Sequence, residues 1–247
     1  MSPTAATGVS LAGRTALARC AVYTFLARAL AYPDDQQLTV IRSELVPMLR
    51  TVRTDDAALS AALAAALAEV DAPLDELRAS HAVLFPPAGR SELCVYESVY
   101  RTRDLFQEAE TLADIAGFYR AHGLVVGGVE RERPDHLAVE LEFMAFLARK
   151  RAFALAELGR ARANSCRLAE AAFLRDHLGS WGPLAGEELA RMVAHPFYRA
   201  IGSLLATWLR GDMAIHAVAA APLVPPAAGP AERVERDDAC PLEMVLS

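Results

Sequence analysis

No hydrophobic run in the 247-residue sequence approaches the roughly 20 residues that a membrane-spanning helix needs, so we expect no membrane anchor. Residues 1–13 lack a charged segment followed by an apolar run, and they contain no pair of adjacent arginines. A secretory or twin-arginine export signal needs one of these features. The sequence therefore predicts a protein that stays in the cytoplasm.

An excess of positive charge is also missing. Lysine and arginine together number 25 against 31 aspartates and glutamates, which gives a formal net charge of -6 and an isoelectric point near 5.6. General nucleic-acid binding requires a basic face that neutralises phosphates. We therefore expect no nucleic-acid partner, and the acidic balance favours a basic one.

Cysteines are few and widely spaced. The four of them, at positions 20, 94, 166 and 240, form no Cys-x-x-Cys pair or other spacing typical of a zinc site. Free thiols in a reducing compartment are the simplest interpretation, with a disulfide as the alternative. The sequence gives no reason to expect a bound metal or another cofactor.

Strand signals are scarce as well. Aromatic residues make up only 7% of the chain, and β-branched residues never alternate with polar ones over the length of a strand. What the sequence has instead is much alanine within its 53% of hydrophobic residues, and alanine is the strongest helix former. We therefore predict an all-α fold with essentially no sheet.

Helix boundaries follow from the aspartate pairs Asp34-Asp35 and Asp55-Asp56 as caps, from prolines at the starts of segments, and from glycine after residue 122. We expect helices over residues 11–31, 35–49, 56–71, 73–84, 97–122 (one or two helices), 134–151, 164–178, 186–194 and 196–218. They predict a single compact, bundle-like domain of about nine or ten helices over residues 14–218. A flexible N-terminus (1–13) precedes this domain, and a disordered Pro/Ala-rich tail (219–247) follows it.

The densest cluster of chemically capable side chains lies where the strongest predicted helix begins. Glu132, Asp135 and Glu140 can together present carboxylates to a cation, and His136 lies one helical turn from Glu140. In a purely structural interpretation, Asp135 caps the helix and His136 pairs with Glu140. His136 and Glu140 can also supply two metal ligands, but a third and a fourth are not evident nearby. A metal-dependent hydrolase built on Asp135, His136 and Glu140 is a weaker alternative, because no nucleophile–base pair and no glycine-rich phosphate loop supports it.

Two motifs resemble, in order and spacing, those of the TorD/DmsD family of redox-enzyme maturation chaperones, which is related to NarJ. The family pattern Glu-x-Pro-Asp-His followed by Glu-Leu-Glu-Phe matches residues 132–136 and 140–143. The run Tyr-Glu-Ser-Val-Tyr at 96–100 is similar to a second family block, and it follows a Leu-Phe and proline-rich loop at 84–89. The resemblance extends over about residues 15–215.

The resemblance implies an all-helical chaperone without catalytic activity and without a cofactor. Such a chaperone binds the N-terminal leader, usually of the twin-arginine type, of the catalytic subunit of a molybdenum enzyme of the DMSO reductase class. It assists molybdopterin cofactor insertion and assembly before export. The implied partners are this apo subunit and molybdenum-cofactor delivery proteins, and the chaperone itself is a monomer or a homodimer.

The resemblance also implies a leader-binding site. Leader recognition is assigned first to Asp135 and His136, supported by the carboxylates of Glu132 and Glu140. The opposite wall is assigned to Tyr96, Glu97, Ser98 and Tyr100. Each charge-assisted hydrogen bond to arginine contributes about 1.5–3 kcal/mol, whereas micromolar affinity needs about 8 kcal/mol, so an apolar groove has to contribute.

Two alternatives stay open beside this site. Glu97 and Ser98 can merely cap the helix that begins there. The chain can also be a helical adaptor that recognises no leader.

Overall fold

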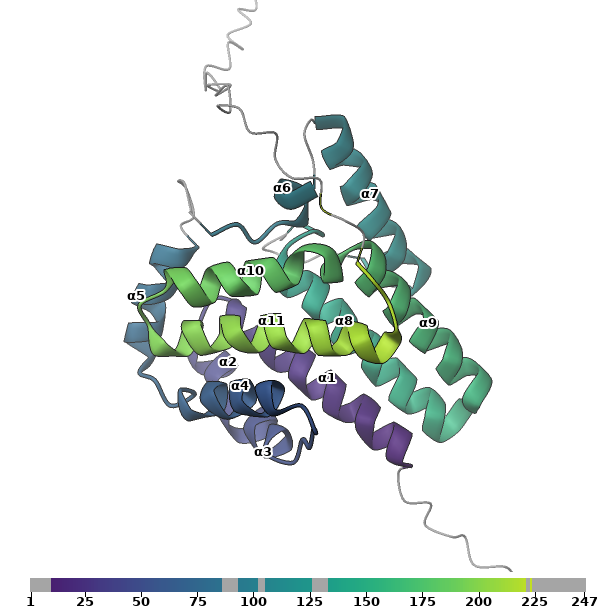
Figure 1. Cartoon of the computed structure of the whole chain (residues 1–247), viewed down its shortest axis with the longest axis horizontal. Coiled ribbons are helices and arrows are strands. Elements are labelled where there is room, and N and C mark those ends of the chain that lie inside the picture. The colour runs from purple at the N-terminus through teal and green to yellow at the C-terminus, as the bar shows by residue number, and fades with distance from the viewer. Residues whose placement is uncertain (1–9, 86–92, 102–104, 126–132, 221–222, 224–247) are drawn as a thin grey trace, which may run out of the picture.

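The computed structural model describes residues 10–85, 93–101, 105–125, 133–220 and 223. Over these residues the chain is built of helices and contains no β-strand, and the extended pairing among them is limited to one antiparallel bridge between Tyr96 and His136. The predicted all-α fold is confirmed (Figure 1). None of the described helices is long and apolar enough to cross a membrane.

The helices follow one another along the chain as labelled in Figure 1. Their bounds are α1 (Leu11–Leu30), α2 (Asp35–Val40), the π-helical segment η1 (Ile41–Leu45), α3 (Val46–Leu49), α4 (Ala57–Ala68), α5 (Leu74–Leu84), α6 (Glu97–Arg101), α7 (Leu105–Ala121), α8 (Leu137–Phe153), the π-helical segment η2 (Ala154–Leu158), α9 (Arg160–Asp176), α10 (Leu178–Met192) and α11 (Pro196–His216). Because η1 and η2 continue their neighbours without a break, the described residues form ten helical runs, in agreement with the predicted nine or ten.

Local capping explains where the first helices begin. The side chains of Ser10, Asp34 and Asp56 each accept a hydrogen bond of 2.7–3.1 Å from a backbone N–H of the following turn. Asp34 and Asp56 thus cap as predicted. The cap at Ser10 starts α1 at Leu11, inside the segment 1–13 that the sequence assigns to a flexible N-terminus.

Two long helix pairs organise the core. α1 packs along α8, and α10 packs along α11, with α9 against α8 and α10. Figure 1 shows α10 and α11 side by side in front of α1 and α8. The buried hydrophobic side chains of these helices form one continuous core, and its largest fully buried members include Trp181, Tyr23, Tyr198, Phe25 and Phe173. This core positions the N-terminal ends of α6 and α8, where the two sequence motifs lie.

Three helices begin more than one residue away from their predicted starts. α8 begins at Leu137 rather than at Pro134, because His136 is still extended in its bridge to Tyr96. α9 begins at Arg160, four residues early, directly after a positive-φ glycine. α10 begins at Leu178 rather than at residue 186 and runs through an internal proline.

Some predictions concern residues outside the described ranges. They are the loop at 86–89, Glu132, Cys240 and the tail 219–247, of which the structure describes Ala219, Ala220 and Leu223. The three described cysteines, Cys20, Cys94 and Cys166, are free thiols.

Candidate functional site

The two sequence motifs meet where α6 and α8 begin. The backbone N–H of Glu97 donates to the carbonyl of Asp135 at 3.0 Å, and a second backbone hydrogen bond of 2.8 Å closes the other side of the bridge. Tyr96 and His136 pair between these two bonds, and their rings lie edge to face with centroids 5.3 Å apart. The structure thus joins the segments at 95–98 and 133–137 into one junction, which we call the motif junction.

The carboxylate of Asp135 lies at the centre of the motif junction and is completely buried. Its Oδ2 accepts a hydrogen bond from the N–H of Ser98 at 3.2 Å, so Asp135 caps the first turn of α6. The residue that caps α8 is His136, whose Nδ1 accepts from a backbone N–H at 3.2 Å. The interpretation in which Asp135 caps its own helix is therefore wrong, because the bridge turns its side chain towards α6.

Arg133 fills the open side of Asp135. Its Nε and one Nη donate to the two carboxylate oxygens at 2.9 and 3.0 Å, which is a bidentate pair. The same Nη lies 2.8 Å from the hydroxyl of Ser98 and 2.8 Å from the carboxylate of Glu108 on α7. The guanidinium carbon is 5.0 Å from the ring centroid of Tyr96, within cation–π range. The hydrogen bond to Asp135 is the main cause that raises the pKa of Arg133, so this group stays a cation.

Two further carboxyl groups are buried next to the motif junction. Glu97 pairs with Arg101 and lies 3.2 Å from Nδ1 of His177. Glu140 accepts a hydrogen bond from the indole N–H of Trp181 at 3.3 Å. Both carboxyl groups are fully buried. Burial, followed by the negative charge of Glu97, raises the pKa of Glu140 well above its ordinary value, so its protonated form is favoured.

Tyr100 connects the motif junction to α10. Its hydroxyl lies 2.7 Å from the carboxylate of Glu188 and 3.2 Å from the carbonyl of Cys94. Its ring lies 5.3 Å from the ring of Trp181, the same residue that donates to Glu140. The described residues assigned to the leader site therefore form one continuous cluster where α6 and α8 begin, and Tyr100 and Glu140 of this cluster contact α10.

Sequence reasoning assigned no role to Arg133, Glu108 or His177, which complete this cluster. Arg133 occupies the variable position of the Glu-x-Pro-Asp-His pattern, and its charge beside Asp135 was the available signal. Glu108 and His177 gave no such signal, because only the fold brings α7 and the end of α9 next to the motifs. Glu132, which was assigned to the same site, lies outside the described residues.

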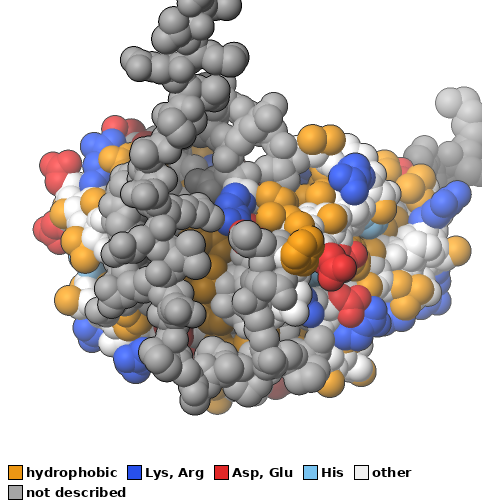
Figure 2. Space-filling model, turned by 90° about the horizontal axis from the view of Figure 1, so that it is seen from above, with side chains coloured by type: hydrophobic (Ala, Val, Ile, Leu, Met, Phe, Trp, Pro, Cys, Tyr) orange, Lys and Arg blue, Asp and Glu red, His pale blue; other side chains and the backbone are white. Residues whose placement is uncertain are grey.

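Large hydrophobic side chains are exposed beside the motif junction. Val99 follows Ser98 in α6 and is 63% exposed, and Phe106 lies in the first turn of α7 and is 85% exposed. Figure 2 looks onto the end of the molecule that carries α6 and α7, and it shows hydrophobic side chains gathered next to basic and acidic ones. This surface offers apolar contact close to a charged site.

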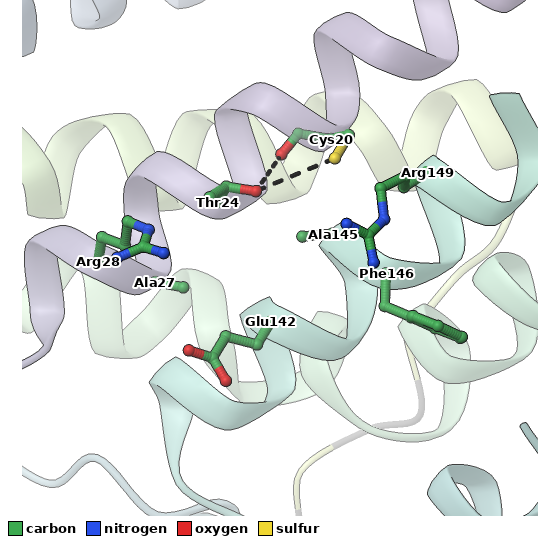
Figure 3. A pocket seen from close by; sticks show the side chains of 8 residues that line it. All are labelled: Cys20, Thr24, Ala27, Arg28, Glu142, Ala145, Phe146 and Arg149. Atoms are coloured by element: carbon green, nitrogen blue, oxygen red, sulfur yellow. Dashed lines mark hydrogen bonds between the residues drawn. The ribbon is translucent and has the colours of Figure 1, made fainter. Parts of the chain in front are cut away.

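A separate cleft of about 230 Å³ lies between α1 and α8. Its lining includes Cys20, Thr24 and Arg28 from α1 and Glu142, Phe146 and Arg149 from α8 (Figure 3). Two arginines and one acid make this cleft a poor receptor for a cationic peptide. Burial raises the pKa of the Cys20 thiol, so the cleft presents no reactive thiolate.

The geometry also bears on the hydrolase alternative. The part of the chain that the structure describes contains no group of three or more histidine, cysteine or acidic side chains placed to hold a metal ion. The carboxylate of Asp135 faces Arg133, whereas that of Glu140 faces Trp181. These side chains therefore do not converge on a common ligand position.

Comparisons with known proteins point to one family. A family model described as nitrate reductase delta subunit matches residues 51–185, more than half of the chain and both motifs. The chain is 38% identical to the perchlorate reductase assembly chaperone protein of Dechloromonas aromatica over 90 residues, which are 36% of this chain and 39% of that protein. It is 31% identical to the chaperone protein TorD of Vibrio cholerae over 140 residues, which are 56% of this chain and 60% of that protein. The chain thus matches less than two thirds of the length of either relative.

Proposed function

Since this chain belongs to the nitrate reductase delta subunit family, we propose that it is a TorD/NarJ-type chaperone of molybdenum enzymes. It binds the twin-arginine leader of one apo catalytic subunit. It does so in the cytoplasm, without catalysis or a cofactor of its own, and delays export until molybdopterin is inserted. The client is an enzyme of the DMSO reductase class. The name of one relative, a perchlorate reductase assembly chaperone protein, supports a reductase as the client.

One observation carries the assignment of the site. The motif junction surrounds a guanidinium group with a bidentate carboxylate, a hydroxyl and an aromatic face, supplied by Asp135, Ser98 and Tyr96. A leader arginine requires the same partners, because its planar fork matches a carboxylate and its face stacks on a ring. We therefore assign recognition of a leader arginine to this junction.

The assigned residues act in two ways in this proposal. Asp135 and its neighbours on the opposite wall, Tyr96 and Ser98, contact the arginine. Glu97 and Glu140 are fully buried, so they act on the leader through the shape of the junction. His136 contributes by capping α8 and by packing its ring against Tyr96.

Charge alone does not give a useful affinity. A charge-assisted hydrogen bond contributes about 1.5–3 kcal/mol, and micromolar binding needs about 8 kcal/mol. The apolar stretch that follows the arginines of a leader has to bury surface as well. Val99 and Phe106 are the exposed hydrophobic side chains beside the junction, and we assign this contact to them.

Calorimetric titration with the leader peptide of the molybdenum-enzyme subunit encoded beside this chain tests the proposal. We expect saturable micromolar binding to the wild type. Asp135→Ala/His136→Ala is expected to weaken it at least about tenfold, which is about 1.4 kcal/mol. A peptide with both arginines changed to lysine should also bind more weakly, because lysine cannot form the bidentate fork. Because Asp135 is buried, its replacement by alanine can also unfold the protein. The isosteric Asp135→Asn and a circular-dichroism melt of each variant therefore separate loss of binding from loss of folding.

Serine substitutions test the apolar contact in the same titration. Val99→Ser and Phe106→Ser should weaken leader binding, whereas Val83→Ser, on the equally exposed face of α5, should not. Strong binding that none of these changes weakens would move the site elsewhere and keep the chaperone function. No binding to the leader or to the full apo subunit would overturn the function and favour a helical adaptor.

A further inference from the structure

Tyr96, Ser98, Glu108 and Asp135 form a site for one guanidinium group, which we call the guanidinium cradle. They supply a bidentate carboxylate at 2.9 and 3.0 Å, a hydroxyl at 2.8 Å, a second carboxylate at 2.8 Å and a ring face at 5.0 Å. The helices α6 and α7 and the bridge between the motifs bring these groups together. Arg133, which occupies the cradle, lies only two residues before Asp135, at the start of the turn that leads into the bridge.

The cradle is closed at its base and open at its entrance. Asp135 is fully buried, and the side chain of Glu108 is 29% exposed, whereas that of Arg133 is 41% exposed. The exposed part of Arg133 therefore marks an entrance to the cradle from the solvent. An arginine from another chain can reach Asp135 by the same entrance, but only after Arg133 has left.

We propose that Arg133 is an internal substitute for a client arginine, and that an arginine of the bound peptide displaces it from the guanidinium cradle. The identity of that peptide rests on the proposed function, whereas the exchange of guanidinium groups does not. The displaced Arg133 turns into solvent, where its charge is hydrated.

Physical chemistry favours exchange over an empty cradle. A buried carboxylate that loses the cation paired with it is strongly unfavourable, so the cradle has to hold a guanidinium in the absence of client. An incoming arginine remakes every bond that Arg133 gives up. The exchange itself is then nearly balanced, and the remaining contacts of the peptide decide whether it occurs.

The internal arginine lowers the apparent affinity for the client and sharpens specificity. A cradle that is vacated about a tenth of the time binds a ligand about tenfold more weakly than a permanently open one. A lysine or a neutral side chain cannot replace the bidentate pair with Asp135, so such peptides fail to displace Arg133. Removal of Arg133 should therefore strengthen binding of an arginine peptide.

The first test needs no client. Arg133→Ala should melt at a lower temperature than the wild type, and millimolar ethylguanidinium should restore part of the loss by filling the cradle. Ethylammonium at equal ionic strength should restore much less. Arg210→Ala, which removes a surface arginine paired with Glu187, should show no such recovery. If ethylguanidinium raises the melting temperature of Arg133→Ala no more than that of Arg210→Ala, the proposal is overturned.

The second test uses the leader peptide. Arg133→Ala, in its folded state, should bind the peptide about tenfold more tightly than the wild type, and the gain should vanish for the peptide with lysines in place of arginines. If Arg133→Ala does not fold, Arg133→Lys, which keeps the charge, replaces it in this titration. Its affinity for the leader peptide should also be higher than that of the wild type. Weaker or unchanged binding by the folded variant would show that Arg133 only shapes the site. If no variant binds any leader, the proposed function fails, while the ethylguanidinium result still decides whether the cradle exchanges its guanidinium.

Discussion

At the scale of single residues, Glu140 is a carboxyl group whose charge is opposed by its surroundings. Burial and the negative charge of Glu97 raise its pKa well above the value of 4.5 that the side chain has in an unfolded chain. Above pH 4.5 the side chain of Glu140 is therefore protonated to a greater extent in the folded protein than in the unfolded chain. The contribution of Glu140 to stability is complete below that pH and is lost as the pH rises through the folded-state pKa.

Glu140→Gln should reduce this decline, because the amide has the size of the protonated acid and carries no charge. The free energy of unfolding of the variant minus that of the wild type should grow with pH by up to about 1.4 kcal/mol per pH unit. Urea unfolding between about pH 5 and about pH 8 measures it. Glu157→Gln, an exposed change on η2, should leave the profile unaltered. A Glu140→Gln profile parallel to the wild type would show that Glu140 is ionised in the folded protein.

At the scale of elements, the contact between α10 and α11 depends on two glycines. A Cβ on Gly202 of α11 would lie 2.6 Å from the N of Ala190 and 2.6 Å from the O of Gly186 on α10. These are backbone atoms, which cannot turn aside as a flexible side chain can. α10 also contains a buried Pro183, which cannot donate a backbone hydrogen bond within the helix.

Gly202→Ala should therefore push α10 and α11 apart and destabilise the protein by about 1–3 kcal/mol. Gly211→Ala is the matched control, because it lies in the same helix and its Cβ would meet nothing within 4 Å. It should stabilise the protein by about 0.5–1 kcal/mol through the higher helix propensity of alanine. Thermal and urea unfolding of the two variants measure the loss of stability expected for Gly202→Ala and the gain expected for Gly211→Ala. Equal effects of the two substitutions would show that the helices do not meet at Gly202.

At the scale of the whole molecule, local signals predict the helices, and tertiary contacts decide the rest. The caps at Asp34 and Asp56 act within one turn, so the sequence alone predicts them. The start of α10 is not predictable locally, because glycine and proline end helices in isolation and packing overrides that preference here. The motifs place Asp135 and Ser98 at the candidate site, but the pairing of Arg133 with Glu108 depends on where α7 lies.

A buried charge network joins the first and last helices of the described chain, and no sequence pattern predicts it. Arg19 of α1 donates to both oxygens of Asp212 on α11 at 2.7 Å, although the two residues are 193 positions apart. It also donates to Glu170 of α9 at 2.6 Å, and Arg151 of α8 reaches the same oxygen at 3.2 Å. The hydroxyl of Tyr23 donates to Asp212 at 2.6 Å. Four helices thus share one set of charges.

Burial alone would raise the pKa of Glu170, but the hydrogen bond from His216 and the charge of Arg19 lower it below 4.5. Its contribution to stability is therefore present above about pH 4.5 and is lost as the pH falls through the folded-state pKa. Arg19→Met leaves two buried carboxylates without their main cation, and we expect a loss of about 3–5 kcal/mol near neutral pH. The loss should shrink in acid, where the wild type also loses the pairing. Arg162→Met, an exposed change on α9, should alter the free energy of unfolding by less than about 0.5 kcal/mol. If Arg19→Met costs no more than this control in urea unfolding, hydrophobic packing alone joins the first helix to the last.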